Sequence, residues 1–518
     1  GDIDVDGTTN LDVVDIDGAV DMASTLQVDG AITFSSTLNG LDILADTTNF
    51  VDSILISQNA STGTLSSASN NTGLGDSVFA ALTSGHDNTV VGKDAGKAIT
   101  TGEENVIVGH KAGDALTDAD YNVAVGRSSL TSDTLGSKST AIGHGTLNTQ
   151  NFTSATDSHN TAVGYNAMAL TTTGVSNTAV GSLALDTNTT ASNNTAVGYA
   201  ALTANTTGAN NAAVGRESLL SNTTGASNTA LGSTSLDANT TASNNTAIGR
   251  AALELNTTGD ENTAVGALCL DANTTGTDNV AMGHKTLGVN TTGGFNTAIG
   301  NDALDANTTA SNNTAVGFAA LGANTTGDLN VSVGALALDA NTTGSQNTAV
   351  GRHALSSNTT ASQNTGIGNN ALGDCTTGAN NSAVGDDCLG SLTTGSENAA
   401  IGRGAGINVT TGTHNVILGI DCGDTLTTGD TNILIGNTAR TSANSGANQI
   451  SMGVVVTCVG DNNFTFGNQG TDSNIAFGAT SITAPSDIRL KEDIQDEEVG
   501  LDFINDLRPV TFLWKKEK

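Results

Sequence analysis

A 17-residue repeat constrains the fold of this chain more than any other feature. Its anchor is the glycine of the motif Asn-Thr-Ala-Val-Gly, which recurs every 17 residues from Gly75 to Gly143 and again from Gly164 to Gly453. A single 21-residue step joins the two series, so the chain contains 23 registers of the repeat. Self-similarity at such a short period is typical of repeat architectures in which each unit packs against its neighbours.

The fullest copy is NTAVGYAALTANTTGAN, residues 194–210, and we number its positions from 0 at the first Asn to 16. Position 4 is Gly, positions 7 and 8 are usually Ala-Leu, and Leu holds position 8 in 13 successive copies from Leu185 to Leu389. Seventeen residues suit two strands of about four residues and two tight turns, because Asn and Gly tolerate turn conformations. We therefore predict an all-β fold, a β-solenoid or β-roll of about 23 stacked 17-residue coils over residues 51–453.

The apolar positions of the repeat predict self-association. Neighbouring residues of a strand face opposite sides, yet positions 2 and 3 are both apolar, as are positions 7 and 8. One face of each strand can fill the interior of the coil, and we expect a second copy of the chain to cover the other. The alternative is that alanine is simply tolerated on an exposed surface. A thin rod of small side chains gains most by association, so we expect the β-solenoid to be oligomeric.

Composition excludes several classes of function. A net charge of -34 argues against nucleic-acid binding, which requires clustered Lys and Arg. No run of 18 apolar residues occurs, so we expect no membrane insertion. Aromatic residues make up only 3% of the chain, which excludes a conventional thick core. The sequence begins with Gly1 and has no visible signal peptide, so we interpret it as part of a longer protein.

Residues 1–50 differ from the repeats because they contain ten Asp and no Lys or Arg. The stretch DIDVDG at residues 2–7 resembles the start of a calcium-binding loop, but position 12 of that loop would be Val13 rather than Glu. Alternation of Ile and Val with Asp instead predicts strands. We assign residues 1–50 to an Asp-rich β segment of a shaft, with adventitious cation binding as the alternative.

The five cysteines do not form a recognisable site. Cys269, Cys388 and Cys422 occupy position 7, Cys375 replaces the Asn of position 11, and Cys458 follows the last full repeat. Cys388 and Cys422 are two coils apart, roughly 9.6 Å at the spacing of β-strands, which is too far for a disulfide. No Cys-x-x-Cys motif or His cluster accompanies them. We predict a small, buried, apolar role for these side chains and no metal or cofactor.

The repeat register shortens after Gly453, to Gly467 and then Gly478, and Phe residues appear. We therefore expect residues 454–485 to form a tapering neck or cap. The turn sequence Asn-Thr-Thr also resembles glycosylation acceptors and the Thr arrays of ice-binding solenoids, but we interpret these stretches as turns.

Composition changes again at Ser486. Fifteen of the last 33 residues are charged, and this segment holds the only Trp of the chain. The apolar pattern predicts a short amphipathic helix over residues 496–509, which Pro509 ends, followed by a strand over residues 510–514. We therefore predict a short α+β C-terminal module over residues 486–518.

The sequence SDIRLKEDI…GLDFINDLRPVTFLW, within residues 486–518, resembles the opening of the endosialidase-type intramolecular chaperone domain. That domain stands at the C-terminus of trimeric phage tail fibres and tailspikes, where it assembles the trimer and then cuts itself off. The resemblance implies Ser486 as nucleophile, Lys491 as its partner and cleavage of the bond between Pro485 and Ser486. A lysine whose pKa is lowered by burial can take the proton of a serine hydroxyl. The remainder of the family domain is absent, so we expect a truncated start.

The repeats are more loosely similar to the head repeats of trimeric autotransporter adhesins, which form left-handed parallel β-rolls. Together the resemblances imply a phage tail fibre or tailspike shaft in the virion tail, outside the cell, that is structural and turns over no substrate. Its partners would be two further copies of itself, other tail proteins and a host-surface glycan or protein. The first alternative is a bacterial trimeric adhesin, which should lead into coiled-coil heptads and a membrane anchor. The second is a glycan-cleaving tailspike, which needs paired carboxylates converging in a groove.

Overall fold

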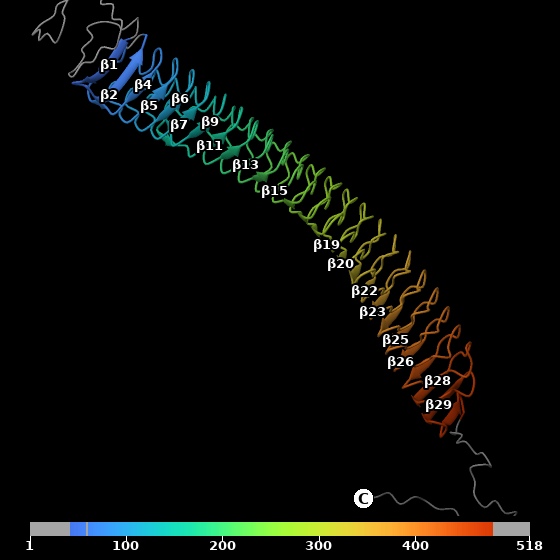
Figure 1. The fold of residues 1–518 in the computed structure, drawn as a ribbon. Coiled ribbons are helices and arrows are strands. Elements are labelled where there is room, and N and C mark those ends of the chain that lie inside the picture. Colours follow the sequence, from blue (N-terminus) through green and yellow to red (C-terminus); the bar gives the residue numbers. More distant parts are fainter. Residues whose placement is uncertain (1–41, 59–60, 480–518) are drawn as a thin grey trace, which may run out of the picture. The chain divides into compact units, whose positions relative to one another are not determined.

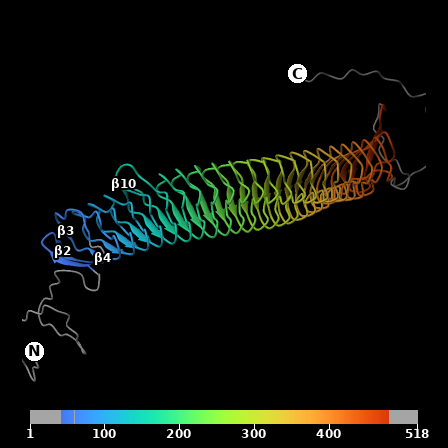
Figure 2. The same cartoon turned by 90° about the horizontal axis from the view of Figure 1, so that it is seen from above.

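The computed structural model describes residues 42–58 and 61–479, and all regular structure among these residues is β. They form two compact units, one from residues 42–139 with 152–156 and the other from residues 140–151 with 157–479. In both units successive strands of the repeat lie side by side along one side of the coils (Figures 1 and 2). The predicted all-β solenoid with a 17-residue spacing is confirmed.

The first unit begins with an antiparallel hairpin and continues as a parallel stack. Strand β1 (Asp42–Thr47) pairs with β2 (Phe50–Ser57), and β2 pairs in parallel with β4. From β4 to β7, each strand pairs in parallel with the strand 17 residues further along the chain, whereas β8 and β10 pair with each other. The remaining strands of this part of the chain are β3 (Ala68–Ser69), β4 (Thr72–Leu74), β5 (Thr89–Val91), β6 (Val106–Val108), β7 (Val123–Val125), β8 (Gly136–Ser137) and β10 (Thr156–Asp157).

The second unit is one long parallel stack in which residues of equal repeat position pair with each other. Its strands are β9 (Thr140–Ile142), β11 (Thr161–Val163), β12 (Thr178–Val180), β13 (Thr195–Val197), β14 (Ala212–Val214), β15 (Thr229–Leu231), β16 (Thr246–Ile248), β17 (Thr263–Val265), β18 (Val280–Met282), β19 (Thr297–Ile299), β20 (Thr314–Val316), β21 (Val331–Val333), β22 (Thr348–Val350), β23 (Thr365–Ile367), β24 (Ser382–Val384), β25 (Ala399–Ile401), β26 (Val416–Leu418), β27 (Ile433–Ile435), β28 (Ile450–Val454), β29 (Asn463–Asn468) and β30 (Ser473–Ala476).

Most coils contain a single strand of three residues at positions 1 to 3, so the prediction of two four-residue strands per coil is wrong. The Ala-Leu segment is a turn, because positions 6 and 8 adopt positive φ, as in Leu183 (φ 60°) and Leu185 (φ 52°). The alternation of a strand therefore does not apply there, and Ala184 and Leu185 are both fully buried. The expectation that position 7 or 8 faces a partner chain is wrong for the same reason.

Glycine at position 4 is required by both conformation and space. Gly317 has a φ of 138°, a region that side-chain-bearing residues rarely adopt. A Cβ atom added there would lie 2.5 Å from the carbonyl oxygen of Gly334 in the next coil. This close backbone approach turns the chain out of the strand and explains why the anchor glycine recurs in every register.

A ladder of buried asparagines at position 0 links the coils. The backbone N–H of Asn194 donates to Oδ1 of Asn177 in the preceding coil at 3.0 Å, and its own Nδ2 donates to the carbonyl of Gly208 at 3.0 Å. The backbone bond repeats in every coil of the second unit from Asn177 to Gln449, whose N–H donates to Asn432. Because buried polar groups are costly when unpaired, this ladder fixes the register between coils while filling the corner of the interior.

The last described residues close the stack. Strand β29 pairs in parallel with β28 and antiparallel with β30, and the rings of Phe464 and Phe466 lie 5.0 Å apart. This hairpin lies within the segment expected to form a neck or cap. Most of the Asp-rich segment (residues 1–41) and the whole predicted α+β module (residues 486–518) lie outside the described residues.

Candidate functional site

The outer face of the parallel sheet in the second unit carries a row of aliphatic side chains. Position 2 points inward and position 3 outward, so Ala230 is buried whereas Leu231 is 47% exposed. Position 3 is Val, Ile, Leu or Met in every coil from Ile142 to Met452, and we call these residues the outer aliphatic row. Continuous apolar surfaces of this kind mark interaction sites on soluble proteins. The sequence pattern left open which of the two apolar positions faces outward, and the structure shows that it is position 3.

A second surface row has a different chemistry. Position 5 follows the anchor glycine, and between residues 144 and 250 we call its residues the position-5 row; they are His144, Tyr165, Ser182, Tyr199, Arg216, Ser233 and Arg250. Tyr165 and Tyr199 are each more than half exposed, as is the side chain of Arg216, which contacts Glu217 at 3.0 Å. The rings of His144 and Tyr165 stack with centroids 5.4 Å apart.

The position-5 row was missed in the sequence analysis, although the sequence contains a signal for it. Six of the Lys and Arg residues within the repeats stand immediately after the anchor glycine; they are Lys93, Arg127, Arg216, Arg250, Arg352 and Arg403. Counting charge by repeat position, rather than over the whole chain, would have identified the concentration of basic side chains in an otherwise acidic protein.

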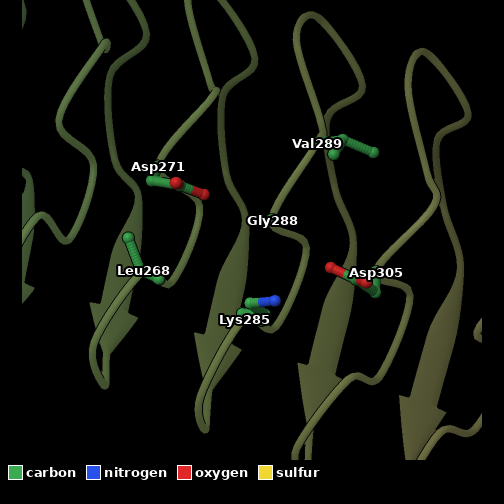
Figure 3. Close-up of a pocket in the computed structure, with 6 residues that line it drawn as sticks. All are labelled: Leu268, Asp271, Lys285, Gly288, Val289 and Asp305. Atoms are coloured by element: carbon green, nitrogen blue, oxygen red, sulfur yellow. The ribbon is translucent and has the colours of Figure 1, made fainter.

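A small surface cavity of about 180 Å³ opens where Gly288 interrupts a series of acidic residues at position 9 (Figure 3). A methyl group on Gly288 would lie 2.9 Å from Oδ1 of Asp305 and 3.6 Å from Oδ1 of Asp271, so the two carboxylates flank the space that glycine leaves. The cavity is lined by Leu268, Asp271, Lys285, Gly288, Val289 and Asp305.

The two carboxyl groups of this cavity hold their protons more tightly than usual. Partial burial raises the pKa of Asp271 and of Asp305, and the charge of Lys285 partly opposes the rise at Asp305. Such a pair can accept hydrogen bonds from hydroxyl or ammonium groups, and one member can donate a proton when protonated. Asp271 and Asp305 are thus a candidate for the paired carboxylates that a glycan-cleaving protein requires.

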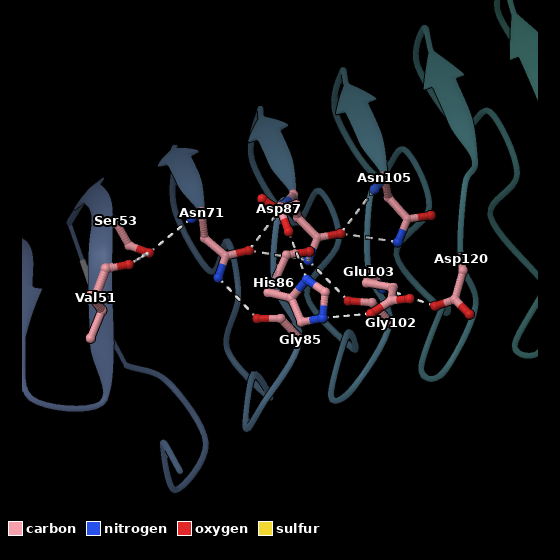
Figure 4. Close-up of polar contacts among 11 residues, drawn as sticks. Val51, Ser53, Asn71, Gly85, His86, Asp87, Gly102, Glu103, Asn105 and Asp120 are labelled. Atoms are coloured by element: carbon pink, nitrogen blue, oxygen red, sulfur yellow. Dashed lines mark hydrogen bonds and ion pairs between the residues drawn. The ribbon is translucent and has the colours of Figure 1, made fainter. Parts of the chain in front are cut away.

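The first unit contains an exposed charged cluster around His86 (Figure 4). Nδ1 of His86 lies 2.7 Å from Oδ2 of Asp87, and Nε2 lies 2.5 Å from Oε2 of Glu103. Hydrogen bonding to Asp87 raises the pKa of His86, and the charge of Glu103 adds to the rise. Beside this cluster, Asp120 accepts a hydrogen bond from the N–H of Glu103 at 2.9 Å. The cluster ties neighbouring coils together on the surface.

The cysteines have the predicted buried role. All five are free thiols with buried side chains. Burial raises the pKa of Cys269 and Cys388 to about 12 and the pKa of Cys375 and Cys422 to about 11. Within the described residues, no group of three or more His, Cys, Asp or Glu side chains could hold a metal ion.

The predicted self-cleavage residues Pro485, Ser486 and Lys491 lie outside the described residues, so their roles stay predictions. No helix in the part of the chain that the structure describes has the length and apolar character needed to cross a membrane. Residues 486–518 match the protein family described as chaperone of endosialidase. No curated protein was found to match the chain. The family resemblance of the C-terminal segment is therefore confirmed.

Proposed function

We propose that this chain forms the shaft of a phage tail fibre or tailspike and that it works as a homotrimer. The observation that carries the proposal is the combination of a 17-residue β-solenoid with a match to the endosialidase chaperone family over residues 486–518. A solenoid supplies length and rigidity, because every coil is bonded to the next through backbone and asparagine ladders. Its work would be mechanical, holding a tip away from the virion and contacting the host surface.

The outer aliphatic row is the proposed contact surface between subunits. Side chains such as Leu231, Met282 and Ile401 are each more than 40% exposed although they are apolar. Burying such a row in a neighbouring copy gains roughly 25 cal/mol for each Å² of apolar surface removed from water. The row repeats with every coil, so two identical stacks can match coil for coil along their length.

We further propose that residues 486–518 begin an assembly module that is removed after trimerisation. Ser486 would attack the carbonyl carbon of Pro485 while Lys491 takes the serine proton. The bond from Pro485 to the Ser486 nitrogen would then break as Lys491 returns the proton to that nitrogen, and water would hydrolyse the resulting ester. This chemistry needs a desolvated lysine, which the folded module would provide.

The alternative of a bacterial trimeric adhesin is less well supported, because the match to the chaperone family stands where an adhesin should continue into heptads. Glycan hydrolysis is a second candidate function, favoured by the pair Asp271 and Asp305 on either side of Gly288. A depolymerisation assay on surface polysaccharides decides this point. Activity that disappears in Asp271→Asn and Asp305→Asn would support hydrolysis.

Light scattering on the purified chain tests the proposed shaft. We expect a mass of three times 51.4 kDa, and Leu231→Asp combined with Ile248→Asp should shift the protein toward the monomer. Leu255→Asp is the matched control, because this leucine is at least as exposed as Leu231 and Ile248 but lies at position 10, away from the sheet. A wild-type mass of one chain, or equal effects of the test and control substitutions, would contradict the proposal.

A further inference from the structure

We propose that the position-5 row binds an extended polysaccharide that carries carboxylate groups. The inference rests on the proposed host-attachment role and assigns to it a binding surface and a ligand chemistry. The row lies within the second unit, between His144 and Arg250, and its aromatic and basic side chains are exposed.

The order of side chains in the row suits a linear polymer. Tyr165 and Tyr199 are separated by Ser182, and Arg216 and Arg250 are separated by Ser233, so a serine stands within each pair of like residues. Like residues are therefore two coils apart, roughly 9.6 Å at the usual strand spacing. A ligand running parallel to the stack meets two aromatic side chains first and two guanidinium groups next.

The row itself is basic, although the neighbouring position 9 of the same coils carries Asp186, Asp237 and Glu254. Positions 1 to 8 of the six coils from residue 161 to residue 253 contain Arg216 and Arg250 but one acidic residue, Glu217, in a chain of net charge -34. Arg216 contacts Glu217, whereas Arg250 makes no ion pair among the described residues. Arg250 can therefore pair with an anionic group of a ligand that follows the position-5 row and stays clear of the acidic side chains at other repeat positions.

The chemistry of the two residue types favours a carboxylated glycan. Tyrosine rings offer flat apolar faces with a hydroxyl at the rim, which suit the apolar faces and hydroxyl groups of a sugar. A guanidinium group binds a carboxylate through two parallel hydrogen bonds. A nucleic-acid strand carries a charge about every 3.4 Å, which is much denser than two arginines two coils apart can match on an acidic protein.

The row stays accessible beside the proposed subunit contact. The anchor glycine turns the chain out of the strand after position 3, so position 5 lies at the edge of the sheet and not on its outer face. The outer aliphatic row can therefore be covered by another copy while Tyr165, Tyr199, Arg216 and Arg250 remain open. Attachment would then take place along the side of the shaft as well as at its end.

Calorimetric titration of the full chain with polygalacturonate, alginate and hyaluronate tests the proposal, with neutral dextran as the control polymer. We expect binding of at least one carboxylated polymer and none of dextran. Arg216→Gln with Arg250→Gln should weaken binding about tenfold or more and flatten its salt dependence, since each charge-assisted hydrogen bond contributes strongly. Tyr165→Ser with Tyr199→Ser should weaken binding without changing the salt dependence, and serine already stands between these positions.

Arg403→Gln is the matched control, because Arg403 also occupies position 5 but lies outside the row and pairs with Asp421 at 2.9 Å. Its binding should equal that of the wild type. No binding to any of the three carboxylated polymers, equal loss in Arg403→Gln, or stronger binding of single-stranded DNA would overturn the inference. Light scattering distinguishes the failure of this inference from the failure of the proposed function. A trimeric mass without polymer binding would refute only the ligand assigned to the position-5 row and would leave the proposed shaft unaffected.

Discussion

Asn358 and Cys375 occupy position 11 of successive coils, and the change from asparagine to cysteine leaves Oδ1 of Asn358 without a hydrogen-bond partner among the described residues. From Asn188 onward, each asparagine at this position accepts a bond from the amide of the next one, as when Nδ2 of Asn358 donates to Asn341 at 2.8 Å. At Cys375 the ladder ends, because the thiol donates instead to the carbonyl of Gly378.

Cys375→Asn should therefore stabilise the protein. The new amide would donate to Oδ1 of Asn358 and to the carbonyl of Gly378, as the preceding asparagines do, and a hydrogen bond to a buried acceptor contributes about 1 kcal/mol. Chemical denaturation should show the gain in the free energy of unfolding. Cys388→Asn is the matched control and should be destabilising, because position 7 offers no ladder of amides. Equal changes in the two variants would count against this account.

Leu253 and Leu255 provide a test of the inward turn of the Ala-Leu segment. Leu253 is fully buried and Leu255 is 52% exposed, although they stand two residues apart. Leu253→Ala should lower the free energy of unfolding by about 2–5 kcal/mol, since it removes a core side chain and leaves a cavity. Leu255→Ala should change it little. Comparable losses in denaturant melts of the two variants would show that the coil interior is assigned wrongly.

The buried thiols should resist modification. Because the thiolate is the reactive form and burial raises the pKa of Cys269 to about 12, very little thiolate exists near pH 8. Titration with a chromogenic disulfide reagent should label the folded chain slowly and label all five cysteines once the chain is unfolded in guanidinium. Fast labelling of the native protein would contradict the burial of these side chains.

The His86 cluster should make a small, pH-dependent contribution to stability. The pKa of His86 is raised above its usual value of 6.5, so its contribution is fully present below pH 6.5 and is lost as the pH rises through the folded pKa. Proton NMR should place the titration of His86 above 6.5 in the wild type and lower in Glu103→Gln. An equal pKa of His86 in the wild type and in Glu103→Gln would rule out the ion pair.

Self-cleavage can be tested in the gene product that contains the complete chaperone domain. Ser486→Ala should leave the C-terminal domain attached, visible as a single larger band on a denaturing gel, because the attacking hydroxyl is missing. Lys491→Met should have the same effect, because no base remains to accept the serine proton. Thr480→Ala, six residues upstream, should cleave normally. Continued cleavage of Ser486→Ala would remove the serine from the proposed role.

Much of the fold follows from sequence because its determinants are local and repeat in every coil. The anchor glycine, with the φ of 138° seen at Gly317, and the inward alanine of position 2, such as Ala230, recur with the period of the chain. The family of the C-terminal segment was likewise recognisable from residues 486–518 alone. The inward placement of both Ala184 and Leu185 was not predicted, because a sequence pattern cannot show that Leu183 and Leu185 adopt positive φ.

The sequence by itself determined the period, the solenoid class and the aliphatic character of position 3, since each depends only on which residue types recur. The tertiary structure decided which of these positions meet water and which side chains become neighbours. Tyr165 and His144 are 21 residues apart in the chain, yet stacking of the coils brings their rings to 5.4 Å. Asp271 and Asp305 flank one cavity for the same reason. Contacts between coils depend on register, and register is fixed only when the backbone and asparagine ladders form.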